Sequence, residues 1–146
     1  MNRRLVAVAA GTLLALGLAG CTGGPTEADR SAWSGWFTEV SSAGSGNSVG
    51  GQVTDSSAAS ATRIDFAEPA TFTSVELRCI GSDRAAFTLT YTGADTTLTL
   101  SQDIVCHGGE PLTPIAVPAQ VGALTAFAAA ATSAQAEGYW VATLQP

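Results

Sequence analysis

The sequence predicts an all-β fold, a jelly-roll-like or Greek-key antiparallel sandwich of about eight strands preceded by one N-terminal helix. Two observations on residues 62–146 lead to this prediction. Turn-forming residues recur about every 8–12 residues, which is typical of sandwiches. Between the turns, apolar residues alternate with polar ones, and many of the polar ones are threonines, whose β-branched side chains suit a pleated surface.

The clearest alternation lies on both sides of a turn at residues 93–95, which read Gly-Ala-Asp. Residues 85–91 and 96–101 each place an apolar side chain at every second position, so that one face of each strand is apolar. The pattern predicts an antiparallel hairpin with its polar face in water. The apolar residues of the shared face are Phe87, Leu89, Tyr91, Leu98 and Leu100.

The remaining strands are marked less clearly. Alanines in residues 119–136 favour a helix, but the all-β surroundings and a preceding glycine favour a strand, so we expect a strand at 123–131. Adjacent residues of a strand face opposite sides, so either Tyr139 or Trp140 should lie on the outside of the closing strand. Further strands are expected at 63–66, 71–80 (with Val75, Leu77 and Cys79 facing inward, opposite Phe72), 103–107, 112–117 and 138–144.

The segment before the sandwich predicts a helix at 26–42 and a Gly/Ser-rich loop at 43–61, with a short strand near 49–53. Thr26 suits the N-cap, and acidic residues follow it in the first turn, where the helix dipole favours negative charge. An aromatic stripe occupies one helical face, formed by Trp33, Trp36, Phe37 and Val40 at i, i+3, i+4 and i+7. This stripe could dock on the sandwich, lie in a membrane interface, or offer a platform to a ligand or partner.

The first 21 residues have the organisation of a secretory signal. Arg3 and Arg4 precede an apolar run of about 14 residues, which is shorter than the roughly 20 that span a bilayer. The run ends in Leu18-Ala19-Gly20-Cys21. This stretch resembles the signal peptide of bacterial lipoproteins, whose lipobox reads Leu-Ala-Gly-Cys. A membrane-spanning helix and an ordinary secreted protein cut elsewhere are the alternatives.

The lipoprotein resemblance implies that residues 1–20 are the signal peptide and that Cys21 carries a diacylglyceryl group on its sulfur. The short Thr-Gly-Gly-Pro run that follows is then expected to act as a tether, so that residues 21–25 are the lipidated cysteine and its tether. The expected location is the extracytoplasmic side of a cell membrane, with lipid as the anchor. The export route, general or twin-arginine, stays open.

The net charge argues against a nucleic-acid-binding surface and against electrostatic attraction to a membrane. Beyond residue 20 the chain has four arginines, no lysine and 12 acidic residues, so its net charge is about 4 − 12 = −8. Such a domain lacks the basic footprint of a nucleic-acid binder. It would also be repelled by anionic headgroups, so that the acyl chains have to supply the membrane affinity.

If Cys21 carries lipid, Cys79 and Cys106 are the two cysteines that remain. Outside the cytoplasm such a pair normally oxidises, and the loop would contribute roughly 3–3.5 kcal/mol. The alternatives are two free thiols, or a metal site that includes His107, for which a fourth ligand of a zinc set is missing.

No catalytic constellation is evident, and we expect neither a metal nor a cofactor. Residues 46–50 spell G-x-S-x-G around Ser48, but the apolar strand and the helix that make a nucleophile elbow are not predicted there. His107 is the only histidine, and we expect it in an exposed turn. A calcium ion in a sandwich loop is left open, although no EF-hand pattern occurs.

These observations favour a non-enzymatic, lipid-anchored envelope domain that binds another protein or an envelope component. The alternatives are a glycan-binding module that uses surface aromatics and, less favoured, a small hydrolase. The candidate ligand or partner surface comprises Trp33, Trp36 and Tyr139, because large aromatic rings with a polar edge suit such surfaces.

Overall fold

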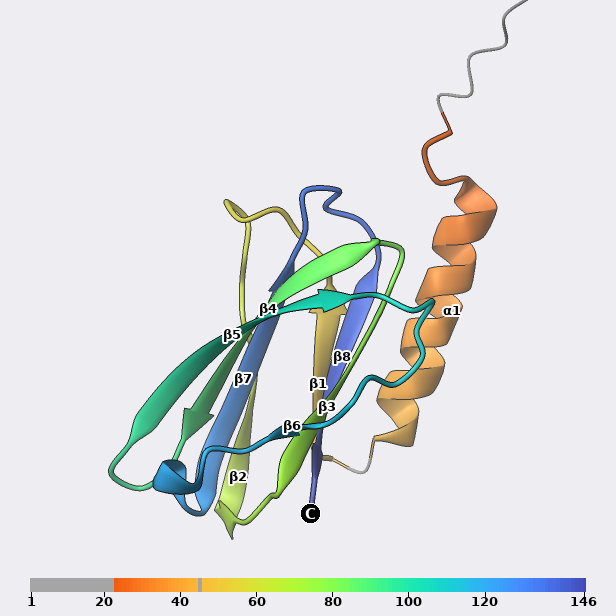
Figure 1. The fold of residues 1–146 in the computed structure, drawn as a ribbon. Helices are drawn as coiled ribbons and strands as arrows, with labels where there is room; N and C mark the ends of the chain where they lie inside the picture. Colours follow the sequence, from red (N-terminus) through yellow and green to blue (C-terminus); the bar gives the residue numbers. More distant parts are fainter. Residues whose placement is uncertain (1–22, 45) are drawn as a thin grey trace, which may run out of the picture.

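The structure is a computed structural model that describes residues 23–44 and 46–146 (Figure 1). The signal peptide and Cys21 lie outside the described residues. One helix precedes eight strands in two antiparallel four-stranded sheets, so the predicted all-β sandwich with an N-terminal helix is confirmed. The elements are α1 (Glu27–Ala43), β1 (Ser48–Gln52), β2 (Thr62–Ala70), β3 (Ser74–Ile80), β4 (Arg84–Thr92), β5 (Thr97–Val105), β6 (Ile115–Ala116), the short 3₁₀ helix η1 (Ala119–Val121), β7 (Leu124–Thr132) and β8 (Tyr139–Gln145).

The strand order identifies the sandwich as a jelly roll. The first sheet has the order β1-β8-β3-β6 and the second has the order β2-β7-β4-β5. Consecutive strands therefore alternate between the sheets, except that β4 and β5 form a hairpin in the second sheet. Two interlocked Greek keys of this kind make the eight-stranded jelly roll.

The core lies between the two sheets and is apolar. Its side chains come from the faces that alternation predicts, including the rings of Phe87 and Trp140, whose centroids are 5.8 Å apart in an edge-on arrangement. The largest fully buried side chains in this core are Trp140, Tyr91, Phe87, Phe127, Leu77, Leu89, Leu124, Leu144, Val75 and Cys79.

Several local predictions need correction. Residues 96–101 and 103–107 were expected as two strands, but β5 runs unbroken from Thr97 to Val105, because each residue keeps its partner on β4 through that stretch. Phe72 was expected on the outer face of a strand, yet it is 8 % exposed and belongs to the core. It precedes β3, so the alternation of that strand does not apply to it.

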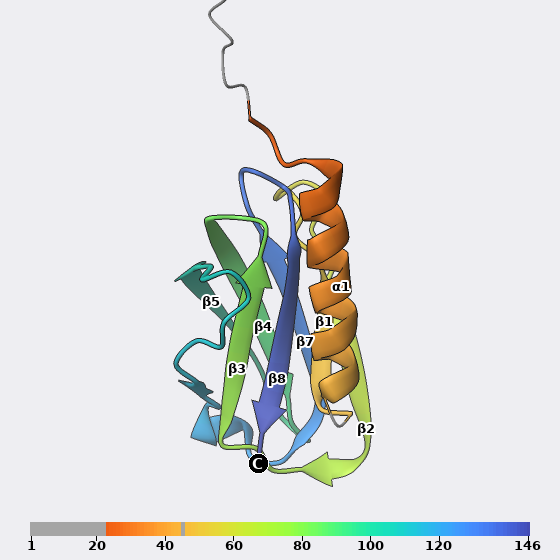
Figure 2. The same cartoon turned by 90° about the vertical axis from the view of Figure 1, so that its right-hand side faces the viewer.

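The strand near 49–53 is confirmed as β1, which lies within the segment expected to be a loop. The ambiguous 119–136 segment contains η1 and the strand β7, whose bounds differ by one residue from the predicted 123–131. Helix α1 lies along the outer face of the first sheet, beside β1 and β8 (Figure 2). The molecule thus has three layers, a helix on a sheet on a second sheet.

Candidate functional site

Helix α1 begins with a reciprocal cap. The hydroxyl of Thr26 accepts a hydrogen bond from the backbone N–H of Asp29 at 3.2 Å, and the backbone N–H of Thr26 donates to the Asp29 carboxylate at 2.8 Å. The Thr26 hydroxyl also donates to the Asp29 carboxylate at 2.7 Å, and this bond, together with the one from the Thr26 backbone N–H, lowers the pKa of the Asp29 carboxyl. The cap fixes the point at which the chain enters the helix, as the sequence predicted.

The aromatic stripe of α1 docks on the sandwich at three glycines, of which Gly50 is in β1, Gly81 is in the turn after β3 and Gly109 is in the segment between β5 and β6. A methyl group added to Gly50 would lie 2.8 Å from the ring of Phe37. At Gly81 it would lie 2.9 Å from the ring of Trp33, and at Gly109 it would lie 2.4 Å from the ring of Trp36. Each ring therefore rests on backbone where a side chain would leave no room. Of the possibilities that the sequence left open for this stripe, the structure shows docking on the sandwich.

A second, small apolar layer fills the space between helix and sheet. Phe37 stacks on Tyr139 with ring centroids 5.0 Å apart and an interplanar angle of 25°. Val141 points to the same side of β8 as Tyr139, away from the main core, yet is only 1 % exposed. The helix thus covers the outer face of β8.

A hollow of about 260 Å³ lies between the first half of α1, the end of β1 and the turn before β8, and aromatic and polar side chains line it. Trp33 and Tyr139 supply aromatic surface. The polar side chains are Arg30, Gln52 and Glu137; Arg30 and Glu137 form an ion pair at 3.4 Å, and the Gln52 amide lies 3.3 Å from the Tyr139 hydroxyl. We call these five residues the aromatic hollow.

The predicted aromatic surface is divided by this geometry. Trp33 and Tyr139 lie together at the hollow, whereas Trp36 rests on Gly109, in the segment between β5 and β6. Of the adjacent pair in β8, Tyr139 is the outer residue and Trp140 is in the core, where its ring N–H donates to the carbonyl of Gln52 at 3.1 Å.

Sequence reasoning did not select Arg30, Gln52 or Glu137 for the hollow. The pairing of β1 with β8 sets Gln52 opposite Tyr139, a relation between residues far apart in the chain. Arg30 does have a local signal, since it lies three residues before Trp33 and therefore on the same side of the helix.

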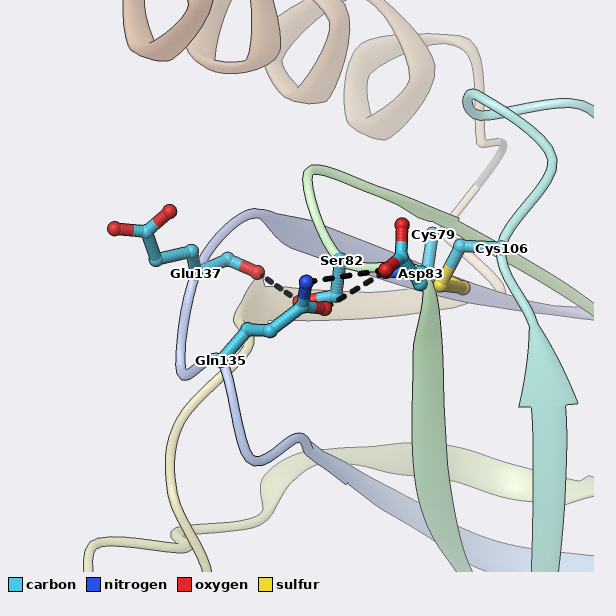
Figure 3. The surroundings of a disulfide bond; sticks show 6 residues. All are labelled: Cys79, Ser82, Asp83, Cys106, Gln135 and Glu137. Atoms are coloured by element: carbon cyan, nitrogen blue, oxygen red, sulfur yellow. Dashed lines mark hydrogen bonds between the residues drawn. A yellow bond between two sulfur atoms is a disulfide. The ribbon is translucent and has the colours of Figure 1, made fainter. Parts of the chain in front are cut away.

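The predicted disulfide joins Cys79 and Cys106 and links the two sheets at one end of the sandwich (Figure 3). Cys79 is in β3 of the first sheet, and Cys106 follows β5 of the second. Nearby, the turn after β3 is bonded to the turn before β8: the hydroxyl of Ser82 donates to the carbonyl of Glu137, and the backbone N–H of Asp83 donates to the Gln135 side chain at 2.8 Å. This end, which carries one wall of the aromatic hollow, is therefore braced.

A wider hollow of about 620 Å³ lies at the same end and is lined by three aspartates. Each is bonded within the chain: Asp55 accepts from Ser57, Asp83 accepts from Gln135, and Asp103 pairs with Arg84 at 2.8 Å. The Asp55 carboxyl has a lowered pKa, chiefly because the Ser57 hydroxyl donates to it. Among the described residues, no cluster of three or more His, Cys, Asp or Glu side chains could hold a metal ion.

Ser48 and His107, the residues that a small hydrolase would use, do not form a catalytic pair. Ser48 opens β1, and its hydroxyl bonds to that of Thr143 at 2.9 Å rather than to an imidazole. His107 is exposed in the segment between β5 and β6, as expected. The turn-and-helix context of a nucleophile elbow is missing, because Ser48 enters a strand.

The described residues contain no helix that is both long and apolar enough to span a bilayer. Comparisons with known proteins add little. No family model matches the chain, and no curated protein matches it. A crystal structure of PirA is similar over 68 % of this chain and 94 % of that chain, with 13 % sequence identity and a TM-score of 0.43.

Proposed function

We propose that the protein is a lipid-anchored domain on the extracytoplasmic face of a cell membrane, and that it binds another molecule rather than catalysing a reaction. The observation that carries the anchor is the sequence Leu18-Ala19-Gly20-Cys21 at the end of an apolar run. The disulfide between Cys79 and Cys106 supports the location, because structural disulfides persist in oxidising compartments.

The proposed anchor also orients the domain. Four residues lie between Cys21 and the helix cap at Thr26, so the five steps from one Cα to the next reach at most about 18 Å. The first turn of α1 lies at the same end as the β1–β2 and β7–β8 loops (Figure 1). We therefore expect these loops to face the membrane and the C-terminal end of β8 to point away from it.

The anchor is tested by expressing the full chain in a bacterium that processes lipoproteins and fractionating the cells. The expected product partitions into the detergent phase, lacks residues 1–20 and carries the mass of an acylated cysteine. Cys21→Ala should keep the signal segment uncut and remove the acyl mass. Release of the unchanged chain into the aqueous phase, without acyl mass, would refute the anchor.

We infer that the ligand site is the aromatic hollow and that a carbohydrate is the best-matched ligand class. Sugars offer C–H faces that pack on aromatic rings and hydroxyl groups that exchange hydrogen bonds with charged and amide side chains. Trp33 and Tyr139 provide the first kind of surface, and Arg30, Gln52 and Glu137 provide the second. At about 260 Å³, the hollow suits one sugar ring rather than a long chain.

Carbohydrate binding is tested by titrating the protein with soluble cell-wall glycan fragments and following tryptophan fluorescence. Saturable binding should be lost in Trp33→Ala and in Glu137→Gln. Trp36→Ala is the matched control, because Trp36 belongs to the same stripe but does not line the hollow. Equal loss in Trp33→Ala and Trp36→Ala would show that helix docking, not the hollow, carries the effect.

A further inference from the structure

The outer edge of β5 carries a row of backbone groups that the fold does not pair. Hydrogen bonds join Cys106 to Asp83 and Gly93 to Thr96, in register with the β4–β5 ladder. Pairing in an antiparallel ladder alternates, so the even-numbered residues of β5 direct their N–H and C=O groups to β4. The odd-numbered residues direct theirs outward, and these are Thr97, Thr99, Ser101, Asp103 and Val105.

The other three sheet edges are protected. At the edge of β1, Thr62 donates its hydroxyl to the carbonyl of Gly50, and Trp140 donates to that of Gln52. The edge strand β2 has a register shift between Asp65 and Ala70 that includes a proline, and β6 is two residues long. Irregularity, proline and short length are the usual ways to prevent pairing with another chain.

Strand β5 has none of these devices. It is nine residues long, keeps an unbroken register with β4, and contains neither proline nor glycine. Its one charged residue, Asp103, is held by Arg84. Val105 is 43 % exposed, and no other large hydrophobic side chain among the described residues is exposed. Such an edge is suited to receive another strand.

The sequence of β5 matches a second copy of itself. If two copies meet about a two-fold axis at Ser101, every outward N–H and C=O of one strand faces a partner on the other. Asp103 then lies opposite Thr99, so no like charges face each other along the strands. Val105 lies opposite Thr97, which gives a pair of β-branched side chains. Leu98 lies opposite Ile104, and both pack inward against the core.

We propose that the protein forms a symmetric dimer in which β5 pairs antiparallel with β5 of a second copy, so that the two β2-β7-β4-β5 sheets become one eight-stranded sheet. The proposal is independent of the acyl anchor and of the aromatic hollow, because β5 contributes to neither.

The test places a cysteine on the proposed axis of the full-length protein. In Ser101→Cys the two added cysteines face each other with Cα atoms about 5.5 Å apart, within disulfide range. Thr99→Cys is the matched control: its residue is exposed on the same face, but its symmetry mate is four residues away, about 13 Å. The unsubstituted protein, oxidised in the same way, is the control for any crosslinking through Cys21. The expected result under mild oxidation is a reducible dimer for Ser101→Cys and none for Thr99→Cys.

A second variant tests the dimer without crosslinking. Ser101→Pro removes an N–H that points away from β4, so it spares the β4–β5 ladder. The parent protein should have twice the molar mass of this variant by light scattering, with matching circular dichroism spectra. A monomeric parent at all concentrations, or equal crosslinking of Ser101→Cys and Thr99→Cys, would overturn the proposal. A parent that pairs only with a different protein would overturn it too.

Discussion

The docking of α1 on glycines predicts a difference between two neighbouring substitutions. Gly108 and Gly109 both have positive φ angles, 63° and 89°. An added methyl group meets nothing within 4 Å at Gly108 but lies 2.4 Å from the ring nitrogen of Trp36 at Gly109. Alanine at either position loses about 1–2 kcal/mol of stability because of the left-handed backbone. Alanine at Gly109 should lose more, because Trp36 must move.

The extra loss can be worked from the contact that Trp36 makes. A fully buried large aromatic side chain removes about 150–250 Å² from water, which contributes about 4–6 kcal/mol at 25 cal/mol/Å². Trp36 is only partly buried, so its contribution is about half of that, or about 2–3 kcal/mol. Moving the ring by about 1 Å forfeits a quarter to a half of its contacts, or roughly 0.5–1.5 kcal/mol. Gly109→Ala should therefore destabilise the protein by that much more than Gly108→Ala.

Urea unfolding, followed by far-ultraviolet circular dichroism, measures this difference. In a Trp36→Ala background the two alanine variants should become equal, because the ring that one of them strikes is absent. Equal losses in the parent background, or an unchanged difference without Trp36, would refute the account of helix docking.

Three further predictions concern stability. Replacing Cys79 and Cys106 by alanine opens a link between residues 27 apart in sequence and should cost about 3.5 kcal/mol in urea unfolding, whereas a loss below about 1 kcal/mol would contradict the estimate. Burial raises the pKa of Tyr91 to about 12, and its hydroxyl is buried without a partner. Because the folded state disfavours the phenolate, the protein loses stability as the pH rises from about 10 toward 12 and loses none from this group at lower pH. The unpaired hydroxyl itself costs stability, so Tyr91→Phe should stabilise the protein by about 1–2 kcal/mol at pH 7 and should flatten its alkaline unfolding. An unchanged alkaline profile would count against this prediction. The lowered pKa of Asp29 contributes stability above about pH 4, and this stability disappears as the pH falls further. Thr26→Ala should therefore weaken the dependence of the melting temperature on pH between pH 5 and pH 2. An identical acid profile in this variant would argue against the cap.

Much of the sandwich could be predicted from period-two alternation. The pattern was strong where one face is buried and the other carries threonine, as in β4, and it placed Phe87, Leu89 and Tyr91 in the core. The same alternation misplaced Phe72, because β3 begins only at Ser74 and Phe72 therefore lies outside the strand whose alternation was applied to it. The break expected within β5 was wrong because Gln102 and Asp103 are polar without forming a turn; Asp103 is held on the outer face by Arg84.

The aromatic hollow could be predicted only in part. Helical spacing correctly placed Trp33 and Trp36 on one face, and alternation in β8 separated Tyr139 from Trp140. Which tryptophan meets Tyr139 depends on where the helix crosses the sheet, and this is set by close contacts at glycines far along the chain. Those contacts leave no periodic signal in the sequence.

The most direct test of the proposed function is the intact mass of the full-length protein recovered from the membranes of a lipoprotein-processing bacterium. The proposal predicts a chain that begins at Cys21 and carries the added mass of a diacylglyceryl group, with Cys79 and Cys106 oxidised. A chain that retains residues 1–20, or one that begins elsewhere without acyl mass, would contradict it.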